Sequence, residues 1–341
     1  MESISNIGSI VPGRETLRKL YLNVRNCARS CYTCNNNLIT DALELRTERD
    51  KMLIGAHGLV FTGTFDEAGL RRSIEGTGKA GFDLIEIPLM DAEGFDSALA
   101  ERMLRDNGLA VTASLGLTPS TDLTSDDPTA VAAGVSTLER CIDHVATMGG
   151  DVLCGVIYSA MGKYMAPASE RGVANSQAAI SELATYAAER GIRLSLEVVN
   201  RYESNVFNTG RGALRYLDGV AGEVSVHLDS YHMNIEESDF FQPVHDVAAA
   251  GKLGYVHIGD SHRGYLGTGT VDFATFFRAL HDVAYDGPVV FESFSSAVVS
   301  AELSNTLGIW RNLWQDSDDL AAHANRYIRD ALHAVGTIDL H

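Results

Sequence analysis

The sequence predicts an α/β protein whose main part is a single (β/α)8 barrel, the TIM-barrel architecture. Short apolar runs rich in β-branched residues alternate with stretches of helical periodicity, which is the pattern of parallel βα units. Eight such units occur within about 250 residues, the repeat number and size of a closed barrel. A doubly wound sheet is the alternative, but no glycine-rich dinucleotide loop follows the first predicted strand.

The predicted strands follow one another after Met52. Most are continuous apolar runs, as expected for strands that are covered by helices on the outside and enclose a packed interior. Among the connecting stretches, 66–80 and 175–191 have helical periodicity, and the second is expected to begin with Asn175 as its N-cap and to end at Gly191. The strands are predicted at residues 52–60, 82–88, 109–117, 151–158, 192–199, 224–229, 253–260 and 288–294.

The residues before Met52 differ in character from the rest. They contain asparagine runs and no sustained apolar period, so we expect residues 1–51 to be a poorly ordered N-terminal extension and residues 52–341 to form the catalytic barrel domain, with extra C-terminal helices. The extension carries Cys27, Cys31 and Cys34 at the spacing used by radical S-adenosylmethionine enzymes. Those enzymes place the cysteines after the first barrel strand, so we interpret this match as coincidental.

Charge and composition exclude several classes of partner. The formal net charge is −18, from 27 basic and 45 acidic residues, and it repels phosphate backbones and anionic lipids. We therefore expect no nucleic-acid partner and no membrane partner. The absence of a long apolar run or a signal-type segment predicts a soluble, cytoplasmic protein. Its five cysteines, an odd number, fit a reducing compartment better than a disulfide framework.

Polar side chains close four consecutive predicted strands, the fifth to the eighth. They are Glu197, Asp229, His257 and Glu292, separated by 32, 28 and 35 residues, about one βα repeat each. In a barrel the chemistry lies where strands end and βα loops begin. Three carboxylates and one imidazole suit manganese or magnesium, with cobalt or zinc as further options. One such residue is ordinarily a strand cap, but four in register would repel without a cation, which predicts a divalent metal site.

Four stretches around these positions carry a family resemblance. They are "LEVVNRYES" from Leu196, "HLDSYHMNIEE" from His227, "YVHIGDSHRG" from Tyr255 and "FESFSS" from Phe291. They resemble the ketose 3-epimerases, the D-tagatose, D-psicose (allulose) and L-ribulose 3-epimerases among the xylose-isomerase-like barrels. The resemblance runs from about Met52 to the C-terminal helices and looks closest to the L-ribulose 3-epimerase branch.

The resemblance implies roles for seven residues. In the family, the positions matching Glu197, Asp229, His257 and Glu292 bind a divalent metal, usually Mn²⁺, with Mg²⁺ or Co²⁺ as the other candidates. The positions matching Glu203, His232 and Arg263 are implied to hold the sugar near O1 to O3. Family members form dimers and tetramers, so a homodimer or homotetramer is expected.

The implied reaction is the epimerisation of a free ketose at C3, with substrates of the L-ribulose, D-tagatose, D-psicose or D-fructose type. A proton beside the C2 carbonyl must be removed from one face and returned on the other. A metal that binds O2 and O3 would stabilise the enediolate. Glu197 and Glu292 are then expected to act as the two bases on opposite faces.

Further positions are open to two interpretations. Phe294, two residues beyond Glu292, and His57, near the top of the first strand, are expected to contact substrate, with ordinary barrel packing as the alternative. Residues 264–270, "GYLGTGT", lack a phosphate-loop context, so we interpret them as a flexible substrate loop and favour a free sugar over a sugar phosphate. Residues 309–314, "IWRNLW", form either an apolar subunit contact or a contact with the barrel.

Three other functions remain open. An aldose–ketose isomerase could use a related metal site to move a proton between C1 and C2. A metal-dependent endonuclease of this fold class would need several zinc ligands and a basic face, which the charge of −18 disfavours. A non-catalytic sugar-binding module would not need a pair of opposed carboxylates.

Overall fold

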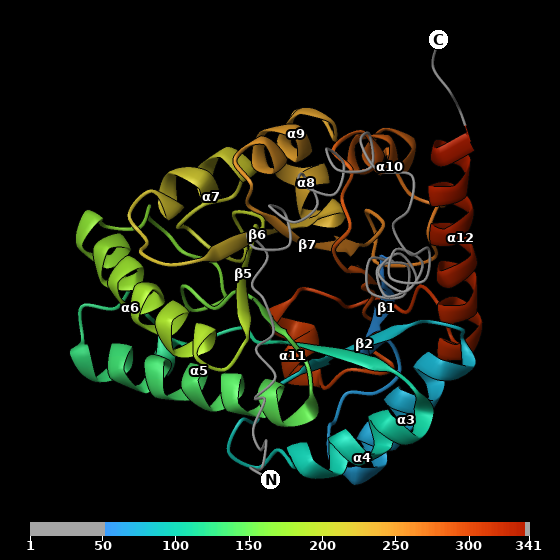
Figure 1. Cartoon of the computed structure of the whole chain (residues 1–341), viewed down its shortest axis with the longest axis horizontal. Helices are drawn as coiled ribbons and strands as arrows, with labels where there is room; N and C mark the ends of the chain where they lie inside the picture. The colour runs from blue at the N-terminus through green and yellow to red at the C-terminus, as the bar shows by residue number, and fades with distance from the viewer. Residues whose placement is uncertain (1–51, 338–341) are drawn as a thin grey trace, which may run out of the picture. The chain divides into compact units, whose positions relative to one another are not determined.

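Eight parallel strands close into one barrel in chain order (Figure 1), in a computed structural model that describes residues 52–337. The barrel prediction is confirmed. The expectations for residues 1–51, including Cys27, Cys31 and Cys34, lie outside the described residues. The strands are β1 (Ile54–His57), β2 (Leu84–Pro88), β3 (Ala110–Ser114), β4 (Val152–Gly155), β5 (Arg193–Glu197), β6 (Val224–Asp229), β7 (Leu253–Ile258) and β8 (Val289–Phe291).

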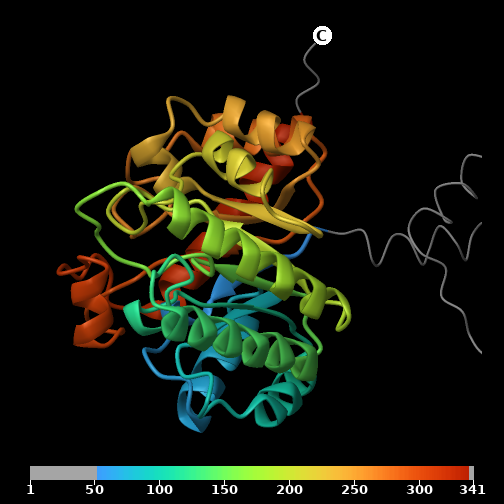
Figure 2. The same cartoon turned by 90° about the vertical axis from the view of Figure 1, so that its left-hand side faces the viewer.

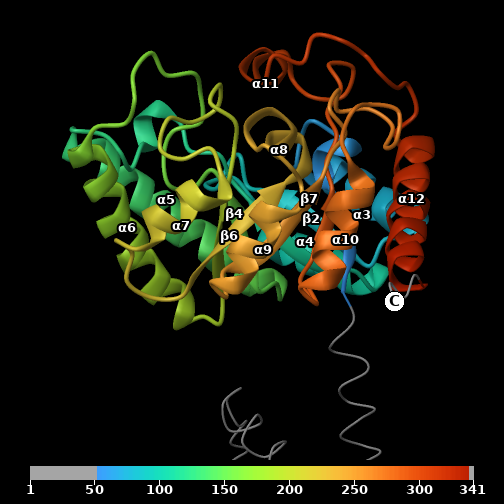
Figure 3. The same ribbon diagram turned by 90° about the horizontal axis from the view of Figure 1, so that it is seen from above.

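A helix follows each strand on the outside of the barrel, and these helices form a ring around it (Figure 1). Figure 2 shows the barrel from the side, with outer helices lying next to one another. Two short helices are additional: α8 (Ser230–Glu236) after β6 and α11 (Ala301–Thr306) after β8. Figure 3 shows α11 with long loops at the barrel end where the strands finish. The outer helices are α3 (Glu67–Lys79), α4 (Ser97–Asn107), α5 (Pro128–Met148), α6 (Glu170–Ala188), α7 (Gly210–Leu217), α9 (Gln242–Ala249), α10 (Phe273–Asp282) and α12 (Ser317–Thr337).

The start of α6 corrects one prediction. Asn175 is not the N-cap, because the hydroxyl of Ser169 accepts a hydrogen bond from the backbone N–H of Gly172 at 3.0 Å and begins the helix earlier. Asn175 lies inside the helix, and its amide donates to the carbonyl of Ser125 at 2.9 Å. The predicted end is close to the observed one, since Gly191 follows the helix with a φ of +72°.

The C-terminal helix α12 completes the outer ring. It packs against α10 and α3, next to β1. Asp318 in its first turn accepts hydrogen bonds from Arg72 and Lys79 of α3, both at 2.7 Å. Of the expected extra C-terminal helices, α12 is thus the eighth helix of the barrel, and α11 is the true addition at the mouth.

The two tryptophans after α11 lie in different environments. Trp314 is buried, and its indole N–H donates to the hydroxyl of Ser293 at 3.0 Å, so it packs on the barrel. Trp310 is 73% exposed. The barrel contact thus holds for Trp314, and a subunit contact through Trp310 stays a prediction.

Candidate active site

Glu197, Asp229, His257 and Glu292 converge at the C-terminal end of the barrel. Each offers one ligand-type atom, and the four atoms lie within 4.8 Å of one another. Glu197 and Asp229 end their strands, His257 is the penultimate residue of β7, and Glu292 directly follows β8. The prediction that all four close their strands is thus correct to within one residue.

The cluster fits a divalent cation. Asp229 Oδ2 and His257 Nδ1 are buried and have no hydrogen-bond partner among residues 52–337. The Nδ1 atom lies 3.5 Å from Glu292 Oε1 and 3.7 Å from both Glu197 Oε1 and Asp229 Oδ2. Unsatisfied buried acceptors are costly, and three clustered carboxylates repel one another, so a bound cation would satisfy both requirements.

The pKa values of the cluster reflect burial and crowding. Burial lowers the pKa of His257, but the charges of Glu86 and Glu292 outweigh burial and hold it well above its usual range. Burial raises the pKa of Asp229, but its interactions with His232, His257 and Arg263 outweigh burial and hold it well below its usual range. The pKa of Glu197 is raised, chiefly by burial.

His227 forms a second candidate set with Glu197 and His257. Its ring is perpendicular to that of His257 at a centroid distance of 4.1 Å, and neither of its nitrogens has a hydrogen-bond partner within the part of the chain that the structure describes. We favour the four-residue set because three carboxylates offset the charge of a divalent cation better than one does. Burial is the main cause that holds the pKa of His227 well below its usual range.

Asn200 holds two of the predicted sugar-binding residues in place. The Nδ1 atom of His232 accepts from the backbone N–H of Asn200 at 3.1 Å, so the ring carries its hydrogen on Nε2. The Asn200 side-chain amide lies 2.8 Å from the same Nδ1 and donates to Glu203 Oε1 at 2.9 Å. His232 Nε2 faces Glu197 Oε1 at 3.6 Å, which presents an N–H donor to the centre of the site.

Arg263 is buried at the same place. It forms an ion pair with Glu292, and its Nη1 lies 3.5 Å from Asp229 Oδ2. Its guanidinium carbon lies 3.7 Å from the ring centroid of Tyr231 and 4.9 Å from that of Phe294. The backbone of Arg263 has a φ of +61°, an uncommon value for a residue with a side chain.

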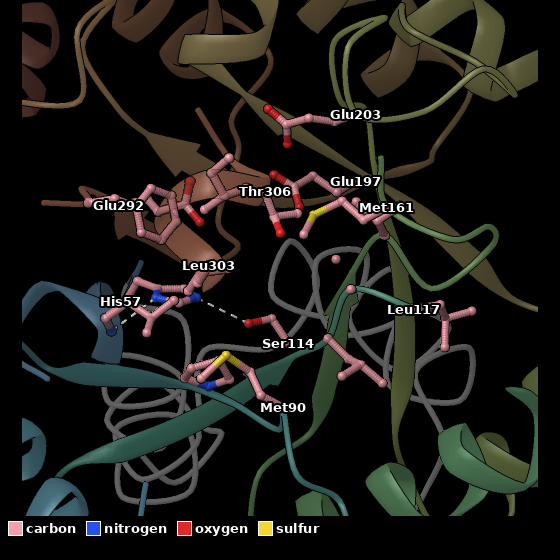
Figure 4. A pocket seen from close by; sticks show the side chains of 18 of the residues that line it. His57, Met90, Ser114, Leu117, Met161, Glu197, Glu203, Glu292, Leu303 and Thr306 are labelled. Carbon is pink, nitrogen blue, oxygen red and sulfur yellow. Dashed lines mark hydrogen bonds between the residues drawn. The ribbon is translucent and has the colours of Figure 1, made fainter. Parts of the chain in front are cut away.

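A cavity of about 640 Å³ opens above the cluster. Figure 4 shows Glu197, Glu203 and Glu292 on one side of it, and His57 and Ser114 joined by a hydrogen bond on another. Apart from the acidic and basic groups, its lining is mostly apolar, which suits a site that fixes one polar end of a small ligand. Its apolar lining includes Met90, Leu115, Leu117, Pro119, Val156, Met161, Phe294, Leu303 and Leu307.

The structure places His57 and Phe294, the two residues that were open to two interpretations, in this cavity. His57 and Phe294 both line it, with ring centroids 5.9 Å apart. The Nδ1 atom of His57 accepts from the backbone N–H of Leu59 at 3.2 Å, and its Nε2 lies 3.3 Å from Ser114 Oγ. Contact of either ring with a sugar stays a prediction.

The predicted substrate loop at residues 264–270 has a different place. None of its residues lines the cavity. The backbone N–H groups of Gly267 and Gly269 donate to Asp260 Oδ2 at 2.9 and 3.1 Å. This carboxylate holds two backbone positions of the loop, and the loop lies outside the cavity lining, where the sequence had predicted a substrate contact; its flexibility stays a prediction.

Sequence reasoning missed Glu86, Asn200 and His227. Glu86 is fully buried in β2 and accepts hydrogen bonds from the side chains of Tyr255 and His257. Its signal in the sequence was a single acidic residue inside the apolar run "LIEIP". Asn200 and His227 stand inside stretches that carried the family resemblance, but their types alone indicated no role.

Comparison with known proteins gives a consistent result. Residues 76–330 match the xylose isomerase-like TIM barrel family. A ketose 3-epimerase from Arthrobacter globiformis is 59% identical over 291 residues, which are 85% of this chain and 100% of the relative. An L-ribulose 3-epimerase from Methylomonas sp. is 53% identical over 276 residues, 81% of this chain and 96% of the relative. A solved structure of a D-allulose 3-epimerase from Methylomonas sp., in complex with D-allulose, has a TM-score of 0.80 and 51% identity over 82% of this chain and 97% of that chain.

The fold, the site and the similar proteins together define this chain as a carbohydrate isomerase with a (β/α)8 barrel. A candidate metal site lies at the mouth of the barrel. The chain belongs to the ketose 3-epimerases, within the xylose isomerase-like TIM barrel family. The resemblance inferred from the four sequence stretches is thereby confirmed. Within residues 52–337, no helix has both the length and the apolar character needed to cross a membrane.

Proposed function

We propose that this chain epimerises free ketoses at C3, by removal of the C3 proton from one face and its return on the other through an enediolate. The observation that carries the proposal is the placement of Glu197 and Glu292 at one cavity, together with Asp229 and His257. These four residues would hold a divalent cation. When bound, the cation supplies positive charge that stabilises negative charge developing on the sugar oxygens.

The side chains around the cluster have complementary tasks. Glu197 and Glu292 act as the two bases, each accepting the proton in one direction and donating it in the other. The Nε2–H of His232 donates to a sugar oxygen near the reacting carbon, because Asn200 occupies Nδ1. Glu203 Oε1 is bonded to Asn200, which leaves Oε2 to accept from a sugar hydroxyl. Arg263 adds a fixed positive charge beside Glu292.

The free-sugar preference is supported by the surroundings of the cavity. The backbone N–H groups of Gly267 and Gly269, two donors of the glycine-rich stretch, are bonded to Asp260 and not free for a phosphate. The substrate panel follows from the relatives, which are named for L-ribulose and D-allulose. We therefore propose L-ribulose and D-psicose (D-allulose) as the first substrates to test, followed by D-tagatose and D-fructose.

We further propose the identity of the cation, the assembly state, the location and the extent of the catalytic domain. Mn²⁺ is the proposed cation, because three of the four ligands are carboxylates. A homodimer or homotetramer is proposed because Trp310 is 73% exposed. A reducing, cytoplasmic location agrees with the free thiols of Cys141 and Cys154. The match to the Arthrobacter relative covers that relative's whole length and 85% of this chain, about the share that residues 52–341 make up, which supports this range as the catalytic domain.

Incubation of each ketose with protein and Mn²⁺ in heavy water tests the reaction. The expected result is the C3 epimer, with deuterium at C3 to the extent that the two carboxyl groups exchange with solvent. Glu292→Gln is expected to lower the rate by ~100-fold or more, the usual contribution of a general base. Deuterium at C1 or C2 together with an aldose product would establish an isomerase instead. Sugar binding without turnover of any ketose would indicate a binding module.

A further inference from the structure

Glu86 is a fully buried carboxylate below the cluster, and the proposed reaction gives it no task. It lies in β2, and its side chain is 0% exposed. A buried charge costs several kcal/mol in desolvation unless well-placed donors and opposite charges compensate for it. One of the hydrogen-bond partners of Glu86 is His257, a proposed metal ligand.

The partners of Glu86 form an ordered chain of hydrogen bonds. Its Oε2 accepts from the hydroxyl of Tyr255 at 2.8 Å and from His257 Nε2 at 2.7 Å. A carboxylate only accepts, so the Tyr255 hydroxyl donates to Glu86, and the hydroxyl of Thr112, 2.6 Å from it, must donate to Tyr255. Every hydrogen in this chain therefore points toward Glu86, and its Oε2 has a fixed position.

The bond to Glu86 determines which nitrogen of His257 is available. A histidine binds a cation only as the neutral imidazole, and with its hydrogen on Nε2 the lone pair is on Nδ1. That atom faces Glu197, Asp229 and Glu292 at 3.5 to 3.7 Å and has no hydrogen-bond partner in the region from residue 52 to residue 337. The second oxygen of Glu86, Oε1, lies 3.4 Å from His57 Nε2 on the cavity wall.

We propose that Glu86 is a positioning residue, which fixes the tautomer and ring orientation of His257 so that its Nδ1 lone pair points at the cation position. This inference rests on the metal site in the proposed function. A carboxylate bonded to the outer nitrogen of a ligating histidine also increases the basicity of the ligating nitrogen, and loss of such a partner commonly costs ~10–100-fold in metal affinity.

The first test is metal binding by the protein without substrate. Wild-type protein and Glu86→Gln are prepared metal-free, and Mn²⁺ is titrated by calorimetry. Glu86→Gln is expected to raise the Kd for Mn²⁺ by ~10–100-fold, because the carboxylate that orients His257 is lost. Tyr255→Phe, which removes a donor but keeps the carboxylate, is expected to raise it by less. Glu237→Gln is the matched control: Glu237 accepts from the backbone N–H of Gly210 and does not line the cavity, so the Kd should not change.

Spectroscopy separates positioning from a general structural effect. In the Co²⁺ form, the visible absorption of Glu86→Gln is expected to differ from that of wild type, whereas Glu237→Gln should reproduce the wild-type spectrum. Equal Mn²⁺ affinity and equal Co²⁺ spectra for wild type and Glu86→Gln would overturn the role of Glu86 and leave the metal site intact. Failure of the wild-type protein itself to bind either metal would overturn the metal site and the Glu86 role together.

A measurement on the unmodified chain removes the dependence on variants that fail to fold. Wild-type protein labelled with ¹⁵N-histidine and loaded with diamagnetic Zn²⁺ is expected to show His257 with its proton on Nε2. His257→Gln, or selective loss of the signal in the Mn²⁺ form, assigns the resonance. A proton on Nδ1 of the bound form would contradict the proposal, whatever the variants show.

Discussion

Arg263, in the loop after β7, forms a buried ion pair with Glu292, the residue that directly follows the neighbouring strand β8. Its guanidinium carbon lies 3.7 Å from the ring centroid of Tyr231, and the residue is only 6% exposed. Burial lowers the pKa of Arg263, but the carboxylates of Glu292 and Asp229 raise it further above its already high value. A permanent cation is therefore fixed beside one of the two proposed bases.

Arg263→Ala is expected to lower kcat/KM by about 100-fold, the scale of losing one preorganised donor in an active site. Mn²⁺ affinity should be kept or should increase, because the removed guanidinium repels a second cation 3.5 Å from Asp229. Steady-state kinetics and calorimetric titration of Mn²⁺ measure the two effects separately. A large loss of Mn²⁺ affinity would show instead that Arg263 supports the metal site.

The matched control is Arg263→Lys. Lysine keeps the charge but loses the planar contact with Tyr231 and Phe294, so activity is expected between that of alanine and that of wild type. Equal activity of Lys and Ala variants would indicate that geometry, rather than charge, is what Arg263 contributes.

Asp229→Asn and removal of the metal test the proposed metal site itself. Dialysis against a chelator is expected to abolish turnover and lower the Tm, and added Mn²⁺ or Co²⁺ should restore both. A ligand at 100 times its Kd stabilises a folded protein by about 2.7 kcal/mol. Asp229→Asn should lose most of this Mn²⁺-dependent rise in Tm, because it removes one of the three charged ligands. Full activity of a demonstrably metal-free preparation would exclude a role for the metal in the reaction.

The sequence predicts features that arise from residues close together in the chain, and it does not predict contacts between residues far apart in the chain. The four cluster residues were found because each closes an apolar strand one βα repeat from the next, and parallel strands place their ends at one edge. The contact between Glu86 and His257 joins residues 171 positions apart. Only the closure of the barrel brings them together, and no periodicity in either strand indicates the pair.

Two predictions, for the start of α6 and for residues 264–270, differ from the structure because a nearby side chain outside the predicted segment forms hydrogen bonds with the backbone. Asn175 is a good N-cap type, but Ser169 stands earlier at a position where its hydroxyl reaches the N–H of Gly172. Residues 264–270 have the glycine content of a mobile loop, but Asp260 accepts hydrogen bonds from two of its backbone N–H groups. In both cases, the side chain that forms the hydrogen bonds lies outside the predicted segment. The sequence pattern within the segment therefore does not reveal those bonds.

The two described cysteines are expected to resist alkylation in the folded protein. Burial raises the pKa of Cys141 to about 12, and burial also raises that of Cys154 well above its usual range. Because the pKa of each thiol is raised, the neutral thiol stays dominant through pH 8.5, and the neutral thiol is the unreactive form. Iodoacetamide at pH 8.5 followed by peptide mass spectrometry should label neither residue without denaturant and both in urea. Rapid native labelling of Cys141 or Cys154 would contradict this packing.

Deletion of residues 1–51 tests the predicted domain organisation and the meaning of the three remaining cysteines together. Among residues 52–337, those that line the cavity lie between His57 and Leu307, and the match to the Arthrobacter relative covers the whole length of that relative. A chain that begins at Met52 is therefore expected to keep its Mn²⁺-dependent epimerase activity, measured as the initial rate of C3 epimer formation.

The full-length protein supplies the matching control. If Cys27, Cys31 and Cys34 held an iron–sulfur cluster, protein purified without oxygen would absorb in the visible range by charge transfer from sulfur to iron. We expect no such absorbance, because these cysteines precede β1, whereas radical enzymes hold their cluster in the loop after the first strand. Triple replacement of the cysteines by serine should likewise leave epimerisation unchanged. Loss of activity in both the truncated and the triple variant, with the barrel still folded by circular dichroism, would assign these residues a part in the reaction.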